Sequence, residues 1–151
     1  MKTFNSIREI LEFAMTGEQG AIDLYTRLAG ETTISEMKEI FMQFAREEMG
    51  HKARLMKIRD EGVMETAGIK VTDMKISDYT ADVQPTPDMD YRDALVLAMS
   101  REKAAFKLYS RLAEQVTETG LKSLFLSLAQ EEARHKLRFE IEYDEFVLRD
   151  N

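Results

Sequence analysis

Both histidines of the chain end short acidic segments of the same form, Glu47–His51 and Glu131–His135. Each segment begins with two glutamates, and the second glutamate precedes the histidine by three positions. Residues three apart lie on one face of a helix, so each segment would direct one carboxylate and one imidazole to the same place. These two groups together are typical ligands of a metal ion. A single such segment is more often a solvated acidic helix face, but its repetition favours a metal site.

The similarity between the two halves of the chain extends well beyond these segments. A shift of 84 positions, which carries His51 onto His135, places residues 14–54 on residues 98–138 without a gap. Identical residues coincide at many of these positions, including Ala14-Met15 with Ala98-Met99, Leu24-Tyr25 with Leu108-Tyr109, and Arg27-Leu28-Ala29 with Arg111-Leu112-Ala113. The chain therefore contains two copies of one helical hairpin.

The composition restricts the class of protein. A chain of 151 residues can bury a substantial core, and we expect a single domain over residues 1–151. The net charge of −7 argues against binding to nucleic acid or to an anionic membrane. No apolar run is long enough to span a bilayer and residues 1–5 hold no apolar signal core, so we expect a cytoplasmic protein. The absence of cysteine excludes disulfides and thiolate metal sites.

The first half predicts a helical hairpin over about residues 5–61, because apolar residues recur every three or four positions through two long segments. The first helix is expected to stop near Gly30. The second is expected to begin near Thr33, which has capping-box spacing with Glu36, and to stop near Gly62. A connection this short makes the two helices antiparallel.

The second half predicts another antiparallel hairpin over about residues 90–149, with Asp90 at its first helix N-terminus. Residues 62–89 hold both prolines, Pro85 and Pro87, and show no sustained helical period. The reach of an extended segment of this length is greater than the length of one of these helices, which is roughly 40 Å, so the segment can return along the bundle. We therefore expect an all-α fold: a four-helix bundle of two antiparallel hairpins joined by a long crossover, with the third helix parallel to the second.

Acidic residues and histidines interrupt each apolar stripe near its middle. The set that faces the expected core is Glu18, Glu48, His51, Glu102, Glu132 and His135. A buried carboxylate is costly unless it is paired or bound to metal. Four carboxylates that converge in an apolar core raise one another's pKa, whereas two divalent cations would balance their charge. The alternative, a salt-bridge network, needs buried basic partners, and the nearest, Lys52 and Lys136, lie one position off the apolar stripe. We therefore predict a dinuclear metal site.

One glutamate from each of two helices and a Glu-x-x-His pair from each of the other two form the ligand set known from ferritin-like di-iron and di-manganese bundles. The whole chain resembles the ferritin-like superfamily and, within it, the rubrerythrin-type di-iron carboxylate domain. The resemblance implies two iron ions, with manganese as the other metal that suits such ligands. It also implies bridging carboxylates, which by symmetry are Glu48 and Glu132, the expected catalytic residues. The terminal ligands then pair by half: Glu18 with His51, and Glu102 with His135.

Four further residues are candidates to support these ligands. Tyr25 and Tyr109 lie two helical turns after the first ligand glutamate of each half, where each could donate a hydrogen bond to a carboxylate. The alternative for both is a core aromatic with a satisfied hydroxyl. Glu47 and Glu131 precede the bridging glutamates and could accept the second N–H of the opposite half's histidine, the alternative being a surface role.

The chain departs from typical rubrerythrins in two respects. Position 105 is alanine, with Ala21 as its symmetric mate, where the family carries an extra glutamate that is linked to metal movement during peroxide reduction. The six-ligand set instead resembles the symmetric bacterioferritin centre. The four-cysteine rubredoxin domain is also missing, so electrons would have to come from an external donor, a rubredoxin-like protein or a reductase.

We therefore expect a di-iron oxidoreductase, rubrerythrin-like or ferroxidase-like, that reduces peroxide or dioxygen in oxidative-stress or iron metabolism. Two alternatives remain open. One is a non-catalytic iron-handling module, and the other is a di-iron oxygenase with an organic substrate, for which Ala21 and Ala105 could leave a pocket. The resemblance also suggests a homodimer, with helices exchanged through the crossover.

Overall fold

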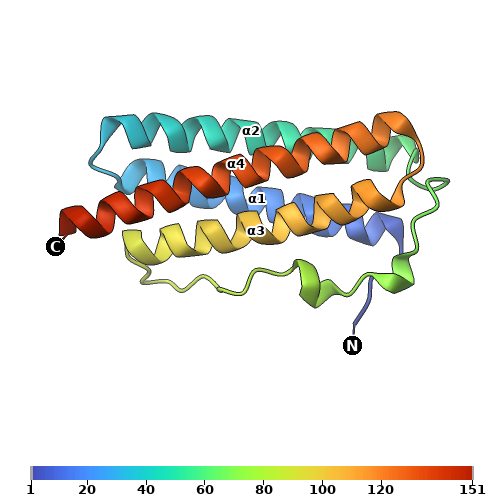
Figure 1. Cartoon of the computed structure of the whole chain (residues 1–151), viewed down its shortest axis with the longest axis horizontal. Helices are drawn as coiled ribbons and strands as arrows, with labels where there is room; N and C mark the ends of the chain where they lie inside the picture. The colour runs from blue at the N-terminus through green and yellow to red at the C-terminus, as the bar shows by residue number, and fades with distance from the viewer. Residues whose placement is uncertain (1, 151) are drawn as a thin grey trace.

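The computed structural model describes residues 2–150, which form a bundle of four long helices (Figure 1). The helices are α1 (Ile7–Glu31), α2 (Ser35–Glu61), α3 (Tyr91–Gln115) and α4 (Thr119–Asp150). Two short 3-10 turns, η1 (Val71–Asp73) and η2 (Ile76–Tyr79), lie between α2 and α3. The predicted all-α four-helix bundle is confirmed. Residues 1 and 151, the ends of the predicted domain, lie outside the described part of the chain.

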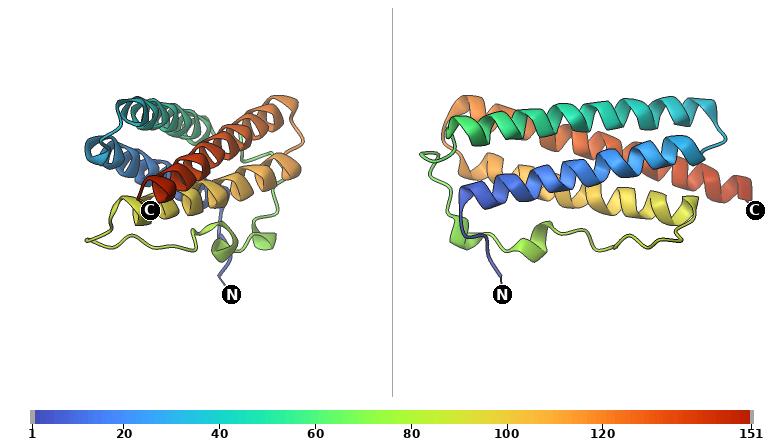
Figure 2. Two further views of the ribbon diagram at one scale, coloured as in Figure 1. Left: turned by 60° about the vertical axis from the view of Figure 1, so that its left-hand side comes forward. Right: turned by 180° about the vertical axis from the view of Figure 1, so that it is seen from behind.

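The four helices form two antiparallel pairs, α1 with α2 and α3 with α4. The segment between the pairs returns along the whole length of the bundle beside α3, so that α3 runs parallel to α2 (Figures 1 and 2). α1 packs against α3, and α2 faces α4, so all four helices contribute to one interior. No helix in the described part of the chain has both the length and the hydropathy needed to cross a membrane.

Side-chain caps fix the start of one helix in each pair. The Ser6 Oγ accepts a hydrogen bond from the Glu9 backbone N–H at 3.0 Å, and the Asp90 carboxylate accepts one from the Asp93 N–H at 2.8 Å. Each cap satisfies a backbone donor that has no partner within the helix. Gly62 ends α2 with a φ of 67°, the left-handed conformation that glycine adopts at low cost. The predicted roles of Asp90 and Gly62 are therefore confirmed.

α1 ends near the predicted position, but the predicted role of Gly30 as its stop is wrong, because the helix continues to Glu31 and Thr32 is its C-cap. The chain leaves Thr32 in an extended conformation, with φ −68° and ψ 142°. This exit needs no residue with positive φ, so Gly30 stays helical.

The predicted capping box of Thr33 and Glu36 is also wrong. α2 begins at Ser35 with Ile34 as its N-cap, and no side chain caps it. The side chain of Ile34 packs against the apolar core, which sets the entry into the helix one residue later than the capping box requires.

The apolar core is divided into two parts that lie on either side of a polar layer. One part contains Leu11, Leu55, Leu112 and Phe125, and the other contains Leu28, Phe41, Leu95 and Phe139. All eight side chains are no more than 1% exposed. The polar layer between these parts lies near the middle of every helix and is therefore shielded from solvent along the bundle axis.

Several hydrogen bonds and apolar contacts hold the crossover against the bundle. Phe4, which is 2% exposed, donates its backbone N–H to the Met74 carbonyl at 3.2 Å, and its ring lies 5.2 Å from that of Phe13. Further along, the Val83 N–H donates to the Ser100 Oγ of α3 at 3.3 Å. These contacts hold the crossover against α1 and α3.

Candidate metal centre

Six polar side chains from all four helices meet in the layer between the two parts of the core. They are Glu18 of α1, Glu48 and His51 of α2, Glu102 of α3, and Glu132 and His135 of α4. None is more than 2% exposed. The structure thus brings together all six residues that the sequence analysis selected as metal ligands.

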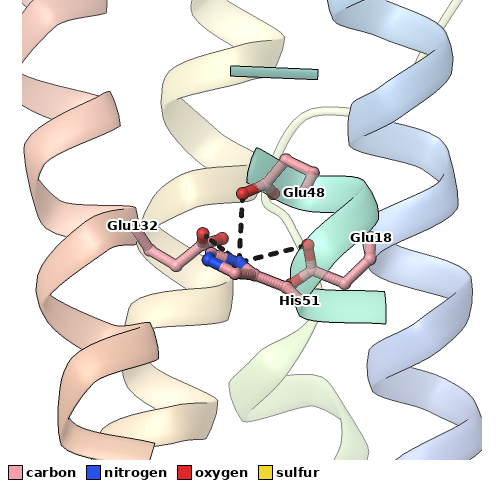
Figure 3. Close-up of side chains that lie close together, drawn as sticks. All are labelled: Glu18, Glu48, His51 and Glu132. Atoms are coloured by element: carbon pink, nitrogen blue, oxygen red, sulfur yellow. Dashed lines mark ion pairs between the residues drawn. The ribbon is translucent and has the colours of Figure 1, made fainter. Parts of the chain in front are cut away.

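The first group of potential ligands surrounds His51 (Figure 3). Its Nδ1 lies 3.2 Å from a carboxylate oxygen of Glu48, 3.2 Å from one of Glu132 and 3.5 Å from one of Glu18. Ligand atoms of these four residues lie within 4.8 Å of one another. One cation could therefore contact all four.

The second group surrounds His135 and repeats this arrangement. The His135 Nδ1 lies 3.4 Å from a carboxylate oxygen of Glu48, 3.5 Å from one of Glu102 and 4.0 Å from one of Glu132. These four residues also offer ligand atoms within 4.8 Å of one another. Glu48 and Glu132 belong to both groups, which is the geometry that two bridging carboxylates would have.

The atoms at the centre of these groups have no hydrogen-bond partners. They are Glu18 Oε2, Glu48 Oε1, Glu102 Oε2, Glu132 Oε1 and the Nδ1 atoms of His51 and His135. Buried polar atoms almost always have a partner, so six without one that converge from four helices require an explanation. Two cations would satisfy all six atoms, and the oxygen and nitrogen donors suit iron or manganese. The residues present therefore fit a dinuclear metal site.

Without metal, the negative charges of the clustered carboxylates repel one another. Burial and the neighbouring carboxylates, those of Glu102 and Glu18 among them, raise the pKa of Glu48 and of Glu132 well above the ordinary value. Burial disfavours a charged His51, but its contacts with Glu18 and Glu48 outweigh burial and raise its pKa to about 10. Protons thus take the place of cations in the metal-free protein.

Basic side chains do not replace metal at this centre. Lys52 donates to the Gln19 side chain at 2.7 Å, and Lys136 pairs with Glu140 at 3.1 Å. Within residues 2–149, no lysine or arginine nitrogen lies within 4.0 Å of the carboxylates of the six-residue cluster. The geometry therefore gives no support to a buried salt-bridge network.

Two buried tyrosines contact the cluster, and each crosses to the opposite half of the chain. The Tyr109 hydroxyl donates to Glu18 Oε1 at 2.5 Å, and the Tyr25 hydroxyl donates to Glu102 Oε1. Burial and the nearby carboxylates raise the pKa of both hydroxyls well above the ordinary value, so both keep their protons. Each hydrogen bond leaves the other oxygen of its glutamate directed toward the centre.

The outer nitrogens of the histidines also face acidic residues of the opposite half. The His135 Nε2 is hydrogen-bonded to Glu47 at 3.3 Å, whereas the His51 Nε2 lies 3.2 Å from Glu131 without forming a hydrogen bond. Burial acts against the charge of Glu47, but hydrogen bonds from Arg134 and His135 outweigh burial and lower its pKa. The ionised Glu47 carboxylate favours a proton on the Nε2 of His135, which leaves the Nδ1 of His135 available as a ligand.

A cavity of about 330 Å³ adjoins the cluster on the side of α1 and α3, under crossover residues 79–85. Its wall includes Ala21 and Ala105, in agreement with the pocket that these small residues were expected to leave. All four glutamates of the cluster also line it. Any molecule in the cavity would therefore lie beside the candidate metal site.

The sequence analysis did not select Arg101, which also lines this cavity. A signal was available, because the 84-residue shift places Arg101 on Gly17, so the repeat is broken directly before the ligand glutamate. The buried Glu142 was missed as well, although it lies seven positions after His135. Glu142 accepts hydrogen bonds from Tyr91 at 2.8 Å and Arg149 at 3.0 Å and does not belong to either ligand group.

Comparisons with known proteins agree with this geometry. A family model described as Rubrerythrin matches residues 9–143, a range that includes every residue of the cluster. The solved structure of a hypothetical protein from Pyrococcus furiosus is similar, with a TM-score of 0.74 and 29% sequence identity over 93% of this chain and 89% of that chain. No curated protein sequence matches at a significant level.

Proposed function

The chain belongs to the rubrerythrin family, and from this premise we propose that it is a di-iron carboxylate oxidoreductase that reduces peroxide or dioxygen. The observation that supports this proposal most directly is the convergence of six unpartnered ligand atoms in two groups that share Glu48 and Glu132. A structural polar network would not need to leave its central atoms without partners.

In this proposal two iron ions would share Glu48 and Glu132 as ligands. Glu18 and His51 would hold one of the ions, and Glu102 and His135 would hold the other. When bound, the metals would supply electrons and a Lewis-acid site for cleavage of an O–O bond. Manganese is the second metal that this ligand set suits.

The surrounding residues would keep this centre ordered and supply its protons. Tyr25 and Tyr109 hold the terminal glutamates in place, and reduction of peroxide to water consumes two protons for every two electrons. Glu47 is 20% exposed while its hydrogen-bonded partner His135 is 0% exposed, so the pair spans the distance between solvent and the centre. We assign the Nε2 of His135 and the Glu47 carboxylate to this proton route.

We further propose a cytoplasmic homodimer that receives electrons from a rubredoxin-like protein or a reductase. The described chain has no cysteine-bound redox centre of its own. Met42, Met49 and Met56 of α2 are 39%, 49% and 40% exposed, and their spacing of seven places them along one face. Such an exposed apolar stripe supports contact with a second protein.

The first test is metal content by elemental analysis, on protein produced with added iron and kept anaerobic. We expect two iron atoms per chain, and we expect Glu48→Ala and Glu132→Ala each to lose the second metal because each removes a bridge. Retention of both metals in either variant would reject the assignment. Wild-type protein with no metal, and with unchanged stability on addition of Fe(II), would reject the enzyme itself. Failure to consume peroxide or dioxygen over many turnovers with a reductant would instead favour an iron-handling module.

The cavity favours one further candidate, an oxygenase that acts on an organic substrate. Its volume of about 330 Å³ lies within the range of small-molecule sites and far exceeds what peroxide or dioxygen needs. Oxygen incorporation into an added organic compound, measured by mass spectrometry with ¹⁸O₂, would distinguish this reaction from simple reduction of oxygen.

A further inference from the structure

Arg101 differs from the other partly buried arginines of the described chain. Four of them pair with acidic side chains within 4.0 Å: Arg27 with Glu31, Arg59 with Asp60, Arg111 with Glu114, and Arg138 with Glu36. Arg101 has no such partner within residues 2–149. A guanidinium is always charged and favours a bidentate carboxylate or phosphate, so Arg101 is poised to bind an anion from outside the chain.

The position of Arg101 is set by Gly20 of α1. The guanidinium lies so close to the Gly20 backbone that a β-carbon there would overlap with it. Both residues line the cavity beside the metal centre, so a carboxylate that contacts Arg101 would lie at the wall of this cavity. Glycine at position 20 thus makes room for the charged group between α1 and α3.

Besides Arg101 and the four glutamates at the metal centre, much of the cavity wall is apolar. Its lining includes Phe13, Val83, Pro85 and Leu108, together with Ala21 and Ala105. A small inorganic anion at Arg101 would leave this apolar surface in contact with water. An organic acid would pair its carboxylate with Arg101 and cover the apolar wall with its hydrocarbon part.

We propose that this cavity binds a small amphiphilic organic acid, with its carboxylate on Arg101 and its apolar part beside the metal centre. The role of that acid as a substrate rests on the oxygenase candidate of the proposed function, because the reaction would take place at the metals. Its binding is a property of Arg101 and the cavity wall and can be measured without turnover.

The test uses octanoate as the probe, with octan-1-ol and acetate as controls for the charge and for the hydrocarbon chain. Binding is measured by isothermal titration calorimetry on metal-free protein and on zinc-loaded protein, which cannot turn over. Octanoate should bind at least tenfold more tightly than either control. Arg101→Gln should weaken octanoate at least tenfold and leave octan-1-ol unchanged, whereas Lys103→Gln, which removes an exposed charge from the same helix, should change neither.

Two further variants test the geometry. Gly20→Ala displaces the guanidinium and should reproduce the loss seen in Arg101→Gln, so the test survives if one variant does not fold. Ala105→Leu fills the cavity and should weaken octanoate and octan-1-ol together. Circular dichroism and the unfolding temperature establish that each variant is folded.

Three results would overturn the proposal: no octanoate binding in either form of the protein, equal octanoate affinity in folded Arg101→Gln, or acetate binding as tight as that of octanoate. The metal content of the same samples separates this proposal from the proposed function. Octanoate binding to a protein that takes up no metal would reject only the di-iron function, and two metals without octanoate binding would reject only the ligand.

Discussion

At the centre, buried carboxylates repel one another and attract the nearby histidine. Bound metal cations would balance the charge of these carboxylates. Glu48 and Glu132 are 1% exposed and lie among other carboxylates, so burial and the repulsion between these carboxylates raise the pKa of each. His51 gains from the same carboxylates, so its pKa rises to about 10. In the metal-free protein all three groups hold protons more tightly than they would in an unfolded chain.

The metal-free protein should therefore lose stability as the pH rises. A group whose folded-state pKa is raised contributes stability below its unfolded pKa and loses that contribution as the pH passes through the folded value. For His51 this loss spans pH 6.5 to about 10, and for Glu48 and Glu132 it begins near the ordinary value of 4.5. Unfolding temperatures measured with a chelator from pH 5 upward would check this. Glu48→Gln, which cannot ionise, should flatten the profile, and a stability that rises with pH would contradict the prediction.

The tyrosine hydroxyls should matter for metal affinity more than for folding. Tyr109→Phe removes the hydrogen bond that orients Glu18 while it keeps the ring in the core. We expect metal affinity to fall by about 10- to 100-fold, the usual effect of losing such a supporting contact. Competition with a chelator of known affinity measures this. Tyr143→Phe, which removes a hydroxyl that accepts a hydrogen bond from the exposed Arg92, is the matched control and should bind metal as the wild type does.

At the scale of helices, the glycines near the C-terminal ends of α1 and α2 have opposite roles. Gly62 stops α2 with a positive φ, whereas Gly30 lies inside the last turn of α1 with open space where a β-carbon would be. Gly62→Ala should lower the free energy of unfolding by about 1–2 kcal/mol, because alanine is strained in the left-handed region. Gly30→Ala should raise it by up to about 1 kcal/mol, because alanine is the better helix former. Urea unfolding of the two variants in parallel would test both signs.

The helices and their polar layer could be predicted because they depend on local spacing. Periodicity located the two hairpins, and the 84-residue shift identified the six residues of the cluster. The end of α1 could not be read in this way, since Gly30 is equally compatible with a stop and with a continued helix. Only the extended exit after Thr32 decides between them.

Contacts between the halves were less predictable than contacts within them. Spacing placed Tyr25 on the same helix face as Glu18, but the hydroxyl reaches Glu102 across the bundle. The cavity depends on how closely α1 approaches α3 and on where the crossover lies. The spacing of apolar residues in the sequence predicts neither of these. Arg101 had a signal in the broken repeat, but its importance is visible only beside Gly20 and the cavity.

At the scale of the whole molecule, the N-terminal segment helps to hold the crossover over the cavity. Phe4→Ala should lower the free energy of unfolding by about 3–5 kcal/mol, because the buried ring leaves a void beside Phe13. It should also make residues 71–79 easier to cleave, which limited proteolysis with mass spectrometry would detect. The control Phe106→Ala removes a ring that is 40% exposed and should change neither property by a comparable amount.

The crossover supplies none of the six groups at the centre. The candidate metal site therefore does not depend on the covalent connection between the two helical hairpins. Each half carries one terminal glutamate, one histidine and one shared glutamate, while the tyrosine that orients each terminal glutamate belongs to the other half. A chain cut near Pro87, in the exposed part of the crossover, would retain every one of these contacts. Metal ions held by ligands from both fragments would then link the two pieces. The fraction of reassembled fragments would therefore report the metal concentration.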